Sequence, residues 1–460
     1  MLLIPLLLLT LGFGIPGRDA RAQADSWTHY AGDAARTSIA STVPPTLDVA
    51  WVAVAATDEA FAARSTPVAH NGRVFVNARR YSGSVQVGNR VIAYAAGNGT
   101  RQWATPIEPD SFDSWSSPAV DVRNDAVLIA SGMTLYALDA GSGAIRWQRL
   151  LFDEVVNASP LVTTDLERDG VPANRAFITD SAPFGNGTLY AVNVDPFDAT
   201  RNPFQPGQIA WSAPIGGTSG NTPAYSDGRV VVATMDGEVL AYDALTGGLP
   251  VWVTDLAPEE FFGGVSIANG AVYAASYNFY GGENNSRLFK LSLTDGQVLW
   301  QTACERTDSI PIPTPDSYVI LSGGIDGFGS VEKVQMFADL GTSATLRWDT
   351  FADSGGQLVL GGWTYQPAYA SGRLAVGVPP IGGFFEAYSD LFVIDTTRGP
   401  ADPGFIMAFH TGSGGGPAVA DDRLYSIGKD GLFAFDLPDG TGYNTTLGGR
   451  SGRGGLDNPP

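Results

Sequence analysis

The sequence predicts an all-β fold: an eight-bladed β-propeller made of four-stranded antiparallel blades and closed into a ring by an N-terminal strand. Three observations carry this prediction. Short apolar runs alternate with a period of two between Asp, Gly and Asn turns, which is typical of β-hairpins, and no long stretch keeps a helical period. Strands that carry tryptophan recur every 41 to 64 residues, which fits blade-sized repeats with loop insertions. One such strand stands alone near the N-terminus, while the last repeat lacks one.

The repeat is clearest in residues 90–103, 134–147, 238–252 and 287–300. Each of these segments has an alternating apolar strand ending near Tyr or Phe, a turn containing Gly, and a strand carrying Trp. The tryptophan series consists of Trp51, Trp103, Trp147, Trp211, Trp252, Trp300 and Trp348, with Phe409 as a degenerate eighth member. Because one large ring recurs at the same strand position of each repeat, we expect these rings to pack between neighbouring blades rather than to stack on a cofactor.

Strand order within a blade is read from residues 116–150, where SSPAVDV, AVLIAS, TLYALDA and AIRWQRL are predicted as strands A to D. The last repeat, GLFAFDL, has no D strand after it, because the chain from Gly440 onward is Gly-rich and aperiodic. Residues 47–55 contain a D-type strand that precedes the first A strand. We therefore predict that residues 47–55 complete the eighth blade and close the ring.

The N-terminal residues 1–24 are predicted to be a secretory signal peptide. An apolar run of about fifteen residues, too short to span a bilayer comfortably, precedes an A-x-A cleavage site at Ala22 and Ala24. No Lys or Arg precedes this run, so an uncleaved membrane anchor is the alternative. The remaining parts are a lead-in segment at residues 25–46, the propeller at residues 47–437 and a Gly-rich tail at residues 438–460. Both flanks of the propeller are expected to be flexible.

Charge and cysteine content exclude several classes of protein. The chain has 27 basic and 47 acidic residues and a formal net charge of −20, which repels phosphate backbones and anionic lipid headgroups. Nucleic acid is therefore not expected as a partner. Cys304 is the single cysteine, so an intramolecular disulfide, a C-x-x-C motif and a lipid-modified cysteine are excluded. We expect an acidic exported protein, periplasmic or extracellular, without stable membrane insertion after signal cleavage.

The pattern Y-A-x-(D)-x-x-(T/S)-G-x-x-x-W resembles the repeat of pyrroloquinoline-quinone (PQQ) propellers, a family that includes quinoprotein alcohol dehydrogenases and an outer-membrane assembly lipoprotein of the same fold. The segment WTHYAGDAARTS at residues 27–38 is similar to the one that precedes the first blade in those proteins. The resemblance covers essentially residues 25–440 and implies the fold, whereas many members of the family bind no quinone.

The dehydrogenases of this family imply further features that the chain does not match. They hold a calcium ion with Glu and Asn, use an aspartate base and carry a disulfide between adjacent cysteines over the quinone. A chain with one cysteine cannot form that disulfide. No Glu, Asn or Asp here matches a catalytic position by motif, so we transfer no catalytic residue.

In a propeller, the D-to-A and B-to-C connections share one face, here called the loop face, where a ligand site can be built on a rigid ring. Acidic, amide and aromatic side chains of the D-to-A connections are expected to surround the channel mouth there: Asp113, Trp115, Asp153, Glu154, Asn157, Asn221, Glu259, Glu260, Asp308, Trp363 and Tyr365. Such a rim could bind a cation, a polar organic ligand or a basic protein surface. Ordinary solvated turns are the alternative interpretation.

One metal-like motif lies between strands A and B of the third blade. Asp165, Glu167 and Asp169, followed by Gly170, place carboxylates at alternate positions before a sharp turn, as at the start of an EF-hand calcium loop. Glu is unusual at the third position of such a loop, and Ala176 occupies the twelfth, where a bidentate Glu belongs. We favour a polar hairpin over a calcium loop.

A complete repeat architecture without a complete catalytic set favours a non-enzymatic function. The sequence predicts an exported scaffold that binds a protein or a small polar ligand on its loop face, with no cofactor expected. The alternative is an alcohol or sugar dehydrogenase that depends on calcium and PQQ, so calcium and PQQ stay possible cofactors. A carbohydrate-binding propeller that uses Trp115, Trp363 and Tyr365 is a third hypothesis.

Overall fold

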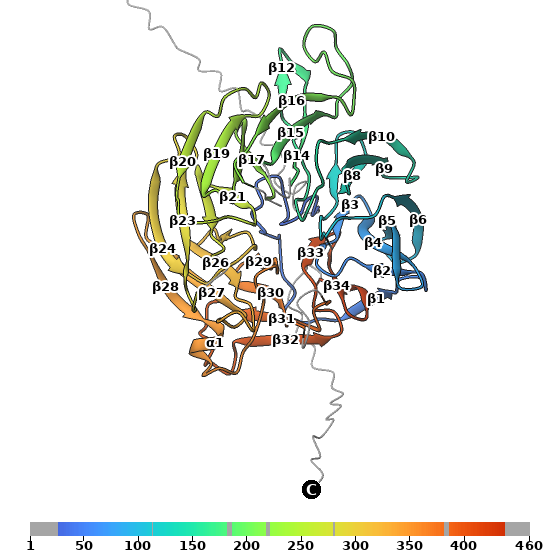
Figure 1. Cartoon of the computed structure of the whole chain (residues 1–460). Coiled ribbons are helices and arrows are strands. Elements are labelled where there is room, and N and C mark those ends of the chain that lie inside the picture. The colour runs from blue at the N-terminus through green and yellow to red at the C-terminus, as the bar shows by residue number, and fades with distance from the viewer. Residues whose placement is uncertain are drawn as a thin grey trace, which may run out of the picture.

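Eight antiparallel sheets follow one another around a ring, and the predicted propeller is confirmed (Figure 1). The structure is a computed structural model that describes residues 26–437, apart from residue 113 and residues 182–185, 218–220, 279–280 and 381–385. The predicted signal peptide and the Gly-rich tail lie outside the described residues. In the described part the single helix, α1 (Thr350–Asp353), is four residues long, and none is long and apolar enough to cross a membrane.

The first four blades use the strands from β2 to β20. Blade 1 contains β2 (Glu59–Phe61), β3 (Val68–His70), β4 (Arg73–Ser82), β5 (Val85–Ala95) and β6 (Arg101–Ile107). Blade 2 contains β7 (Ala119–Asp121), β8 (Ala126–Ser131), β9 (Thr134–Asp139) and β10 (Ile145–Leu150). Blade 3 contains β11 (Leu161–Val162), β14 (Arg175–Thr179), β15 (Thr188–Asn193) and β16 (Ile209–Pro214), with an inserted hairpin of β12 (Glu167–Arg168) and β13 (Val171–Pro172). Blade 4 contains β17 (Ala224–Ser226), β18 (Arg229–Ala233), β19 (Glu238–Asp243) and β20 (Trp252–Asp255).

The other four blades repeat the same order. Blade 5 contains β21 (Val265–Ala268), β22 (Ala271–Ala275), β23 (Ser286–Ser292) and β24 (Val298–Cys304). Blade 6 contains β25 (Ile312–Pro313), β26 (Tyr318–Gly323), β27 (Lys333–Asp339) and β28 (Ala344–Asp349). Blade 7 contains β29 (Ala368–Ala370), β30 (Arg373–Gly377), β31 (Asp390–Asp395) and β32 (Ile406–Thr411). Blade 8 contains β33 (Pro417–Ala420), β34 (Arg423–Gly428), β35 (Gly431–Asp436) and, as its outer strand, β1 (Val49–Ala53).

The ring closes as predicted, because β1 from the start of the propeller pairs with β35 at its end. The two strands are antiparallel, with Trp51 opposite Ala434 and Ala53 opposite Leu432. The indole N–H of Trp51 then donates a 2.7 Å hydrogen bond to the carbonyl of Ala96 in blade 1. The closing strand therefore completes blade 8 and also joins it to blade 1.

The tryptophan series packs between blades, as the sequence predicts. The indole N–H groups of four D strands donate to the carbonyl that follows strand C of the next blade, in the pairs Trp51–Ala96, Trp103–Ala140, Trp211–Ala244 and Trp252–Leu293. A glycine of the next blade's C-to-D turn lies against each ring. A Cβ atom on these glycines would come within 2.4 to 2.6 Å of a ring atom: Gly99, Gly143, Gly247 and Gly296. The Gly and Trp of the repeat are thus two sides of one contact between blades.

We expect Gly247→Ala to destabilise the protein more than Gly248→Ala. Both glycines have positive φ, +62° and +89°, so both substitutions strain the backbone. Only at Gly247 would the new methyl group meet the ring of Trp211, at 2.4 Å, whereas nothing lies within 4 Å at Gly248. The difference in the free energy of unfolding should be about 1 to 3 kcal/mol. Urea denaturation followed by circular dichroism measures it, and equal losses would contradict the contact.

The lead-in segment corrects the expectation of a flexible flank, because the described residues 26–46 run through the central channel (Figure 1). Trp27, Tyr30 and Arg36 are buried. The segment hydrogen bonds to backbone groups of inner strands from six blades, at Ala69, Val120, Val162, Tyr225, Ile267 and Tyr369. Inner strands have one unpaired edge facing the channel, so a chain lying there satisfies their backbone groups and fills the space.

Arg36 is the central anchor of this segment. Its side chain is fully buried, and its guanidinium donates to the carbonyls of Tyr30 at 2.8 Å and of Pro223, Ser159 and Pro160, each at 3.0 Å. Ser159, Pro160 and Pro223 immediately precede the inner strands of blades 3 and 4. One arginine therefore ties the lead-in segment to two blades.

Arg36→Met should lower the free energy of unfolding by about 3 to 5 kcal/mol, because buried carbonyl groups lose their donors while the packing volume is kept. Arg201→Met is a suitable control, since Arg201 pairs with Asp198 at the surface and such pairs contribute about 0 to 1 kcal/mol. Chemical denaturation of both variants tests this. Similar small losses would show that the segment does not stabilise the ring.

Candidate functional site at the channel mouth

Three of the predicted rim residues, Trp115, Asn157 and Asp308, meet at the channel mouth. They surround a hollow of about 10 Å³ together with five residues that the prediction did not include: Tyr30, Thr222, Phe262, Gly263 and Gly264. Trp115 and Asn157 come from consecutive D-to-A connections. The backbone N–H of Trp115 donates to Oδ1 of Asn157 at 3.4 Å, and that of Asn157 to Oγ of Ser114 at 2.9 Å. These bonds hold the two connections against each other.

Two tryptophan rings and the guanidinium of an arginine form the aromatic part of the site. The rings of Trp115 and Trp363 meet edge to face, with their centroids 6.0 Å apart. The guanidinium of Arg64 lies 5.8 Å from the Trp115 centroid and 5.6 Å from that of Trp363, within the range of cation–π attraction. Arg64 is buried and also donates to Oγ1 of Thr364 at 2.5 Å.

Sequence reasoning missed Arg64, although a signal for it exists. The residue lies between β1 and β3, and once β1 is counted as the D strand of blade 8, this stretch is also a D-to-A connection. The predicted rim, however, starts only at the connection after blade 1. An Arg in that first connection could have been added by the same rule.

Asp308 is the titratable group of the site. Burial raises the pKa of its carboxyl to about 8, although the positive charge of Arg64 acts in the opposite direction. Its Oδ1 atom has no hydrogen-bond partner, while its backbone N–H donates to the carbonyl of Trp363 at 2.7 Å. Burial likewise raises the pKa of Glu332 and brings that of Tyr388 to about 12. Burial therefore favours the neutral forms of these acids around the guanidinium of Arg64.

The other predicted rim residues have different surroundings. Tyr365 is buried, donates to the carbonyl of Gly415 at 2.8 Å and packs on Tyr388. Asn221 is buried and donates to the carbonyl of Ala233.

The remaining carboxylates also lie away from the hollow. Glu259 pairs with Arg287 at 3.2 Å and accepts a hydrogen bond from Ser276, whereas Glu260 is exposed. Asp153 and Glu154 are half-buried, and the predicted residue Asp113 lies outside the described residues.

The predicted metal motif forms the inserted hairpin of blade 3. Oδ1 of Asp165 accepts a 2.8 Å hydrogen bond from the hydroxyl of Tyr225, Glu167 lies exposed in β12, and Asp169 and Gly170 make the turn with φ of 48° and 73°. In the part of the chain that the structure describes, no three His, Cys, Asp or Glu side chains are grouped so that they could hold a metal ion.

The hollow that the described residues form at this mouth is too small for a quinone. Pockets for organic ligands measure roughly 300 to 1,000 Å³, far more than the hollow of about 10 Å³ between Trp115 and Asp308. Tyr30 of the lead-in segment lines the hollow from the channel side. The carbohydrate hypothesis used Trp115, Trp363 and Tyr365, of which Trp115 and Tyr365 are buried and Trp363 is half-buried.

Asp308→Asn should change how stability depends on pH. The folded-state pKa of about 8 lies above the unfolded value of about 3.9, so the folded protein holds this proton more tightly and loses stability as pH rises between the two values. The stability of Asp308→Asn relative to the wild type should therefore increase from pH 5 to pH 8, by at most about 1.4 kcal/mol per pH unit.

Urea denaturation at pH 5, 6.5 and 8 measures this difference. Asp422→Asn serves as the control, since it makes the same Asp-to-Asn change at an exposed position. Parallel pH profiles for Asp308→Asn and the wild type would contradict a neutral buried carboxyl.

Comparisons with known proteins agree with this architecture. The family described as outer membrane protein assembly factor BamB matches residues 49–194 and 171–365 of this chain. BamB from Yersinia pestis is 32% identical over 119 residues, which make up 24% of this chain and 30% of that protein, so the match spans less than a third of the curated relative.

Solved structures show the same fold at low sequence identity. BamB from Moraxella catarrhalis superposes with a TM-score of 0.57 at 16% identity, covering 85% of this chain and 99% of that one. The quinohemoprotein alcohol dehydrogenase from Comamonas testosteroni superposes with a TM-score of 0.61 at 14% identity, covering 94% and 84%. At these identities the likeness shows the fold alone.

Proposed function

We infer that this chain, which belongs to the family of the outer membrane protein assembly factor BamB, is an exported scaffold that docks a partner protein on its loop face. Following the name of its relatives, we propose that the partner takes part in the assembly of outer-membrane proteins and that the chain works in the periplasm. The observation that carries the proposal is a pair of exposed phenylalanines beside the filled channel mouth.

Phe112 and Phe152 lie on consecutive D-to-A connections and are 72% and 68% exposed. Large exposed aromatic side chains in this position are suited to anchor an interface, since aromatic residues are enriched at protein interfaces and supply much of the binding energy. The backbone N–H of Phe152 donates to the hydroxyl of Tyr190 at 2.9 Å, and the Phe152 ring packs 5.6 Å from that of Tyr190. Phe112 has a φ of +52°, a strained conformation that the surrounding connection must hold in place.

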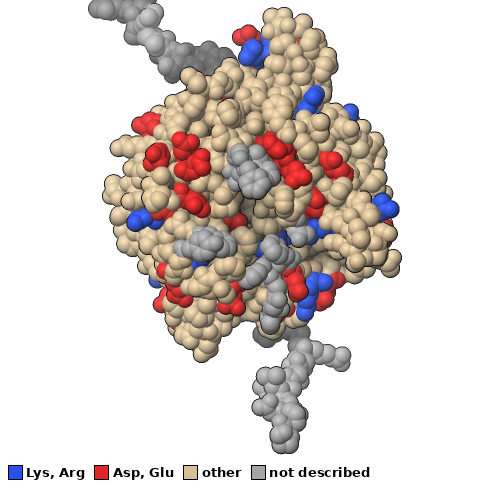
Figure 2. Space-filling model, in the orientation of Figure 1, with Lys and Arg blue, Asp and Glu red and all other residues tan. Residues whose placement is uncertain are grey.

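Charge supports a partner with a basic surface. The chain has a net charge of −20, and Figure 2 shows acidic side chains gathered around the centre of the visible face and over the region of β19 and β20. Complementary charge accelerates association and makes it sensitive to salt. A docking surface with apolar anchors and an acidic surround therefore fits a partner that offers an apolar patch bordered by Lys or Arg.

The variant Phe112→Ser/Phe152→Ser should fail to support this function. In cells without the wild-type chain, restoring it should raise the amount of folded outer-membrane β-barrel protein, whereas the variant should restore much less. Loss of two anchors costs the interface about 2 to 4 kcal/mol, a roughly 30- to 1,000-fold loss of affinity. The amounts of folded β-barrel protein and of the variant itself are measured by semi-native gel electrophoresis and immunoblotting.

The matched control is Leu249→Ser/Phe409→Ser, which removes two side chains that are 89% and 64% exposed outside the D-to-A connections. This control should restore assembly like the wild type. Equal restoration by both double variants would reject the loop-face docking surface. Saturable uptake of PQQ with calcium, followed by dye reduction with an alcohol or sugar, would replace the scaffold with the dehydrogenase alternative.

A further inference from the structure

Trp147 departs from the rule that Trp51, Trp103, Trp211 and Trp252 follow. Two further tryptophans also depart from it: Trp300 donates its N–H to Oδ1 of Asp339 at 2.9 Å, and Nε1 of Trp348 is buried without a partner. By the repeat, the indole N–H of Trp147 should donate to the carbonyl of Val194, the residue directly after β15. That carbonyl accepts instead from Nδ2 of Asn124 at 3.3 Å. Within the described residues Trp147 Nε1 has no hydrogen bond, and it is not among the buried atoms without a partner, in contrast to Nε1 of Trp348. The N–H of Trp147 is therefore open to solvent.

A cavity of about 290 Å³ lies beside this ring, between blades 2 and 3 on the face opposite the loop face. It is lined by A-to-B, C-to-D and strand residues of these blades: Asp121, Asn124, Ala126, Leu128, Ala137, Arg146, Trp147, Val194, Pro196 and Pro206. Seven of these ten residues are apolar. Its size suits one or two residues of a peptide better than a large cofactor.

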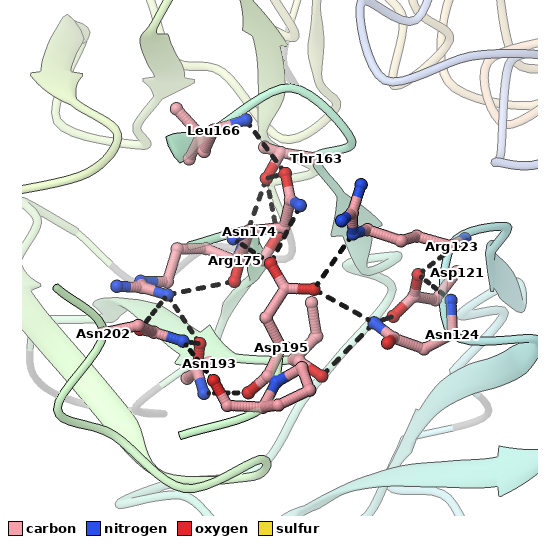
Figure 3. Close-up of polar contacts among 12 residues, drawn as sticks. Asp121, Arg123, Asn124, Thr163, Leu166, Asn174, Arg175, Asn193, Asp195 and Asn202 are labelled. Atoms are coloured by element: carbon pink, nitrogen blue, oxygen red, sulfur yellow. Dashed lines mark hydrogen bonds and ion pairs between the residues drawn. The ribbon is translucent and has the colours of Figure 1, made fainter. Parts of the chain in front are cut away.

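One wall of the cavity is the long C-to-D connection of blade 3, held by a buried polar network (Figure 3). The fully buried Asp195 accepts hydrogen bonds at Oδ2 from the backbone N–H of Asn174 at 2.7 Å and from its Nδ2 at 2.9 Å. Nδ2 of Asn202 donates to the carbonyl of Pro196 at 3.1 Å and to Oδ1 of Asn193 at 3.0 Å. These bonds hold Pro196 in place before any ligand binds. Binding therefore does not carry the entropy cost of ordering this wall of the cavity.

The network also reaches across to blade 2. Nδ2 of Asn124 donates to Oδ1 of Asp195 at 3.4 Å, and Nε of Arg123 lies 3.6 Å from the same atom (Figure 3). The two walls of the cavity are thus joined beneath it by polar contacts. A cavity built in this way keeps its shape without a ligand.

The charged side chains at the rim are already engaged with protein groups. Oδ1 of Asp121 accepts from the backbone N–H groups of Arg123 and Asn124, and its Oδ2 accepts from Nδ2 of Asn124. Arg146 donates to Oδ2 of Asp139 at 2.7 Å and to the carbonyl of Asn124. The indole N–H of Trp147, by contrast, has no protein acceptor among the described residues and lies beside an apolar surface.

We propose that this cavity binds a proline-rich, extended segment of a partner polypeptide. A prolyl ring fills the apolar space beside Trp147, Pro196 and Pro206, and a backbone carbonyl of the segment accepts the indole N–H. Proline fits because its ring is apolar, its tertiary amide is an acceptor without an N–H, and the polyproline II helix is ordered before binding. A sugar fits less well, since it needs several free polar groups. This site stands apart from the loop-face surface and does not rest on it.

Indole N–H signals of the full chain labelled with ¹⁵N-tryptophan test the proposal. The chain has ten tryptophans, and Trp147→Phe identifies the signal of Trp147 while keeping an aromatic ring. Acetylated, amidated octaproline should shift this signal in a saturable way, and a Gly-Ser peptide of equal length should not. Trp147→Phe should weaken octaproline binding about tenfold, whereas Trp103→Phe, which loses a hydrogen bond to Ala140 instead, should leave it within about twofold.

The same variants check the premise through stability. Trp103→Phe should cost about 1 kcal/mol more than Trp147→Phe, because only Trp103 donates its N–H to the protein. In D₂O the N–H of Trp147 should exchange faster than that of Trp103. Slow exchange at Trp147 would overturn the proposal.

Three binding results would also overturn it. These are no shift with millimolar octaproline, unchanged affinity in Trp147→Phe, and a shift with methyl glucoside but not with octaproline, which would assign the cavity to carbohydrate. The variant Phe112→Ser/Phe152→Ser should bind octaproline like the wild type. Failure at one face is thereby distinguished from failure at the other.

Discussion

The pairing of β1 with β35 is the constraint on which the rest of the structure depends. It joins strands from the two ends of the propeller, so the entropy of closing a very long loop opposes it. In return it completes blade 8 and brings Trp51 against Gly99 of blade 1, the same kind of contact that Gly143, Gly247 and Gly296 make between other blades. Closure turns a row of blades with two exposed apolar ends into a ring in which each blade packs against two neighbours.

Closure of the ring also determines where the lead-in segment before β1 lies. The lead-in segment precedes a strand at the rim of blade 8, yet it lies in the channel, where Arg36 and the backbone bonds to inner strands hold it. This segment stabilises the ring and fills the channel. Its residue Tyr30 lines the small hollow beside Trp115 and Asp308, so little space remains there. The same residues that stabilise the ring therefore leave little space for a ligand at the channel mouth, and the proposed docking surface accordingly lies on the connections that carry Phe112 and Phe152.

Internal repetition makes departures from the repeat informative. Four tryptophans donate to the carbonyl that follows the neighbouring C strand, and this sets the expectation for Trp147. In blade 3 that carbonyl belongs to Val194, at the start of a long connection held by Asp195, and a side chain of blade 2 has taken it. The indole N–H of Trp147 is thereby left without a protein acceptor, and the cavity between blades 2 and 3 lies beside it. Neither feature is visible when Trp147 is considered without its counterparts.

The sequence by itself determined the architecture, because strand alternation, the Gly–Trp repeat, the lone D-type strand near the N-terminus and the missing D strand of the last repeat are local or periodic properties. It also placed Trp115, Asn157 and Asp308 on one face, since strand order alone decides which connections share that face. Only the tertiary structure decided that Arg64 lies between Trp115 and Trp363, that Tyr365 and Asn221 point into packed surroundings, and that residues 26–46 fill the channel. These outcomes depend on contacts among residues far apart in the chain and on the conformation of aperiodic segments. No local pattern encodes them, because the partners that stabilise each side chain are assembled only when the ring closes.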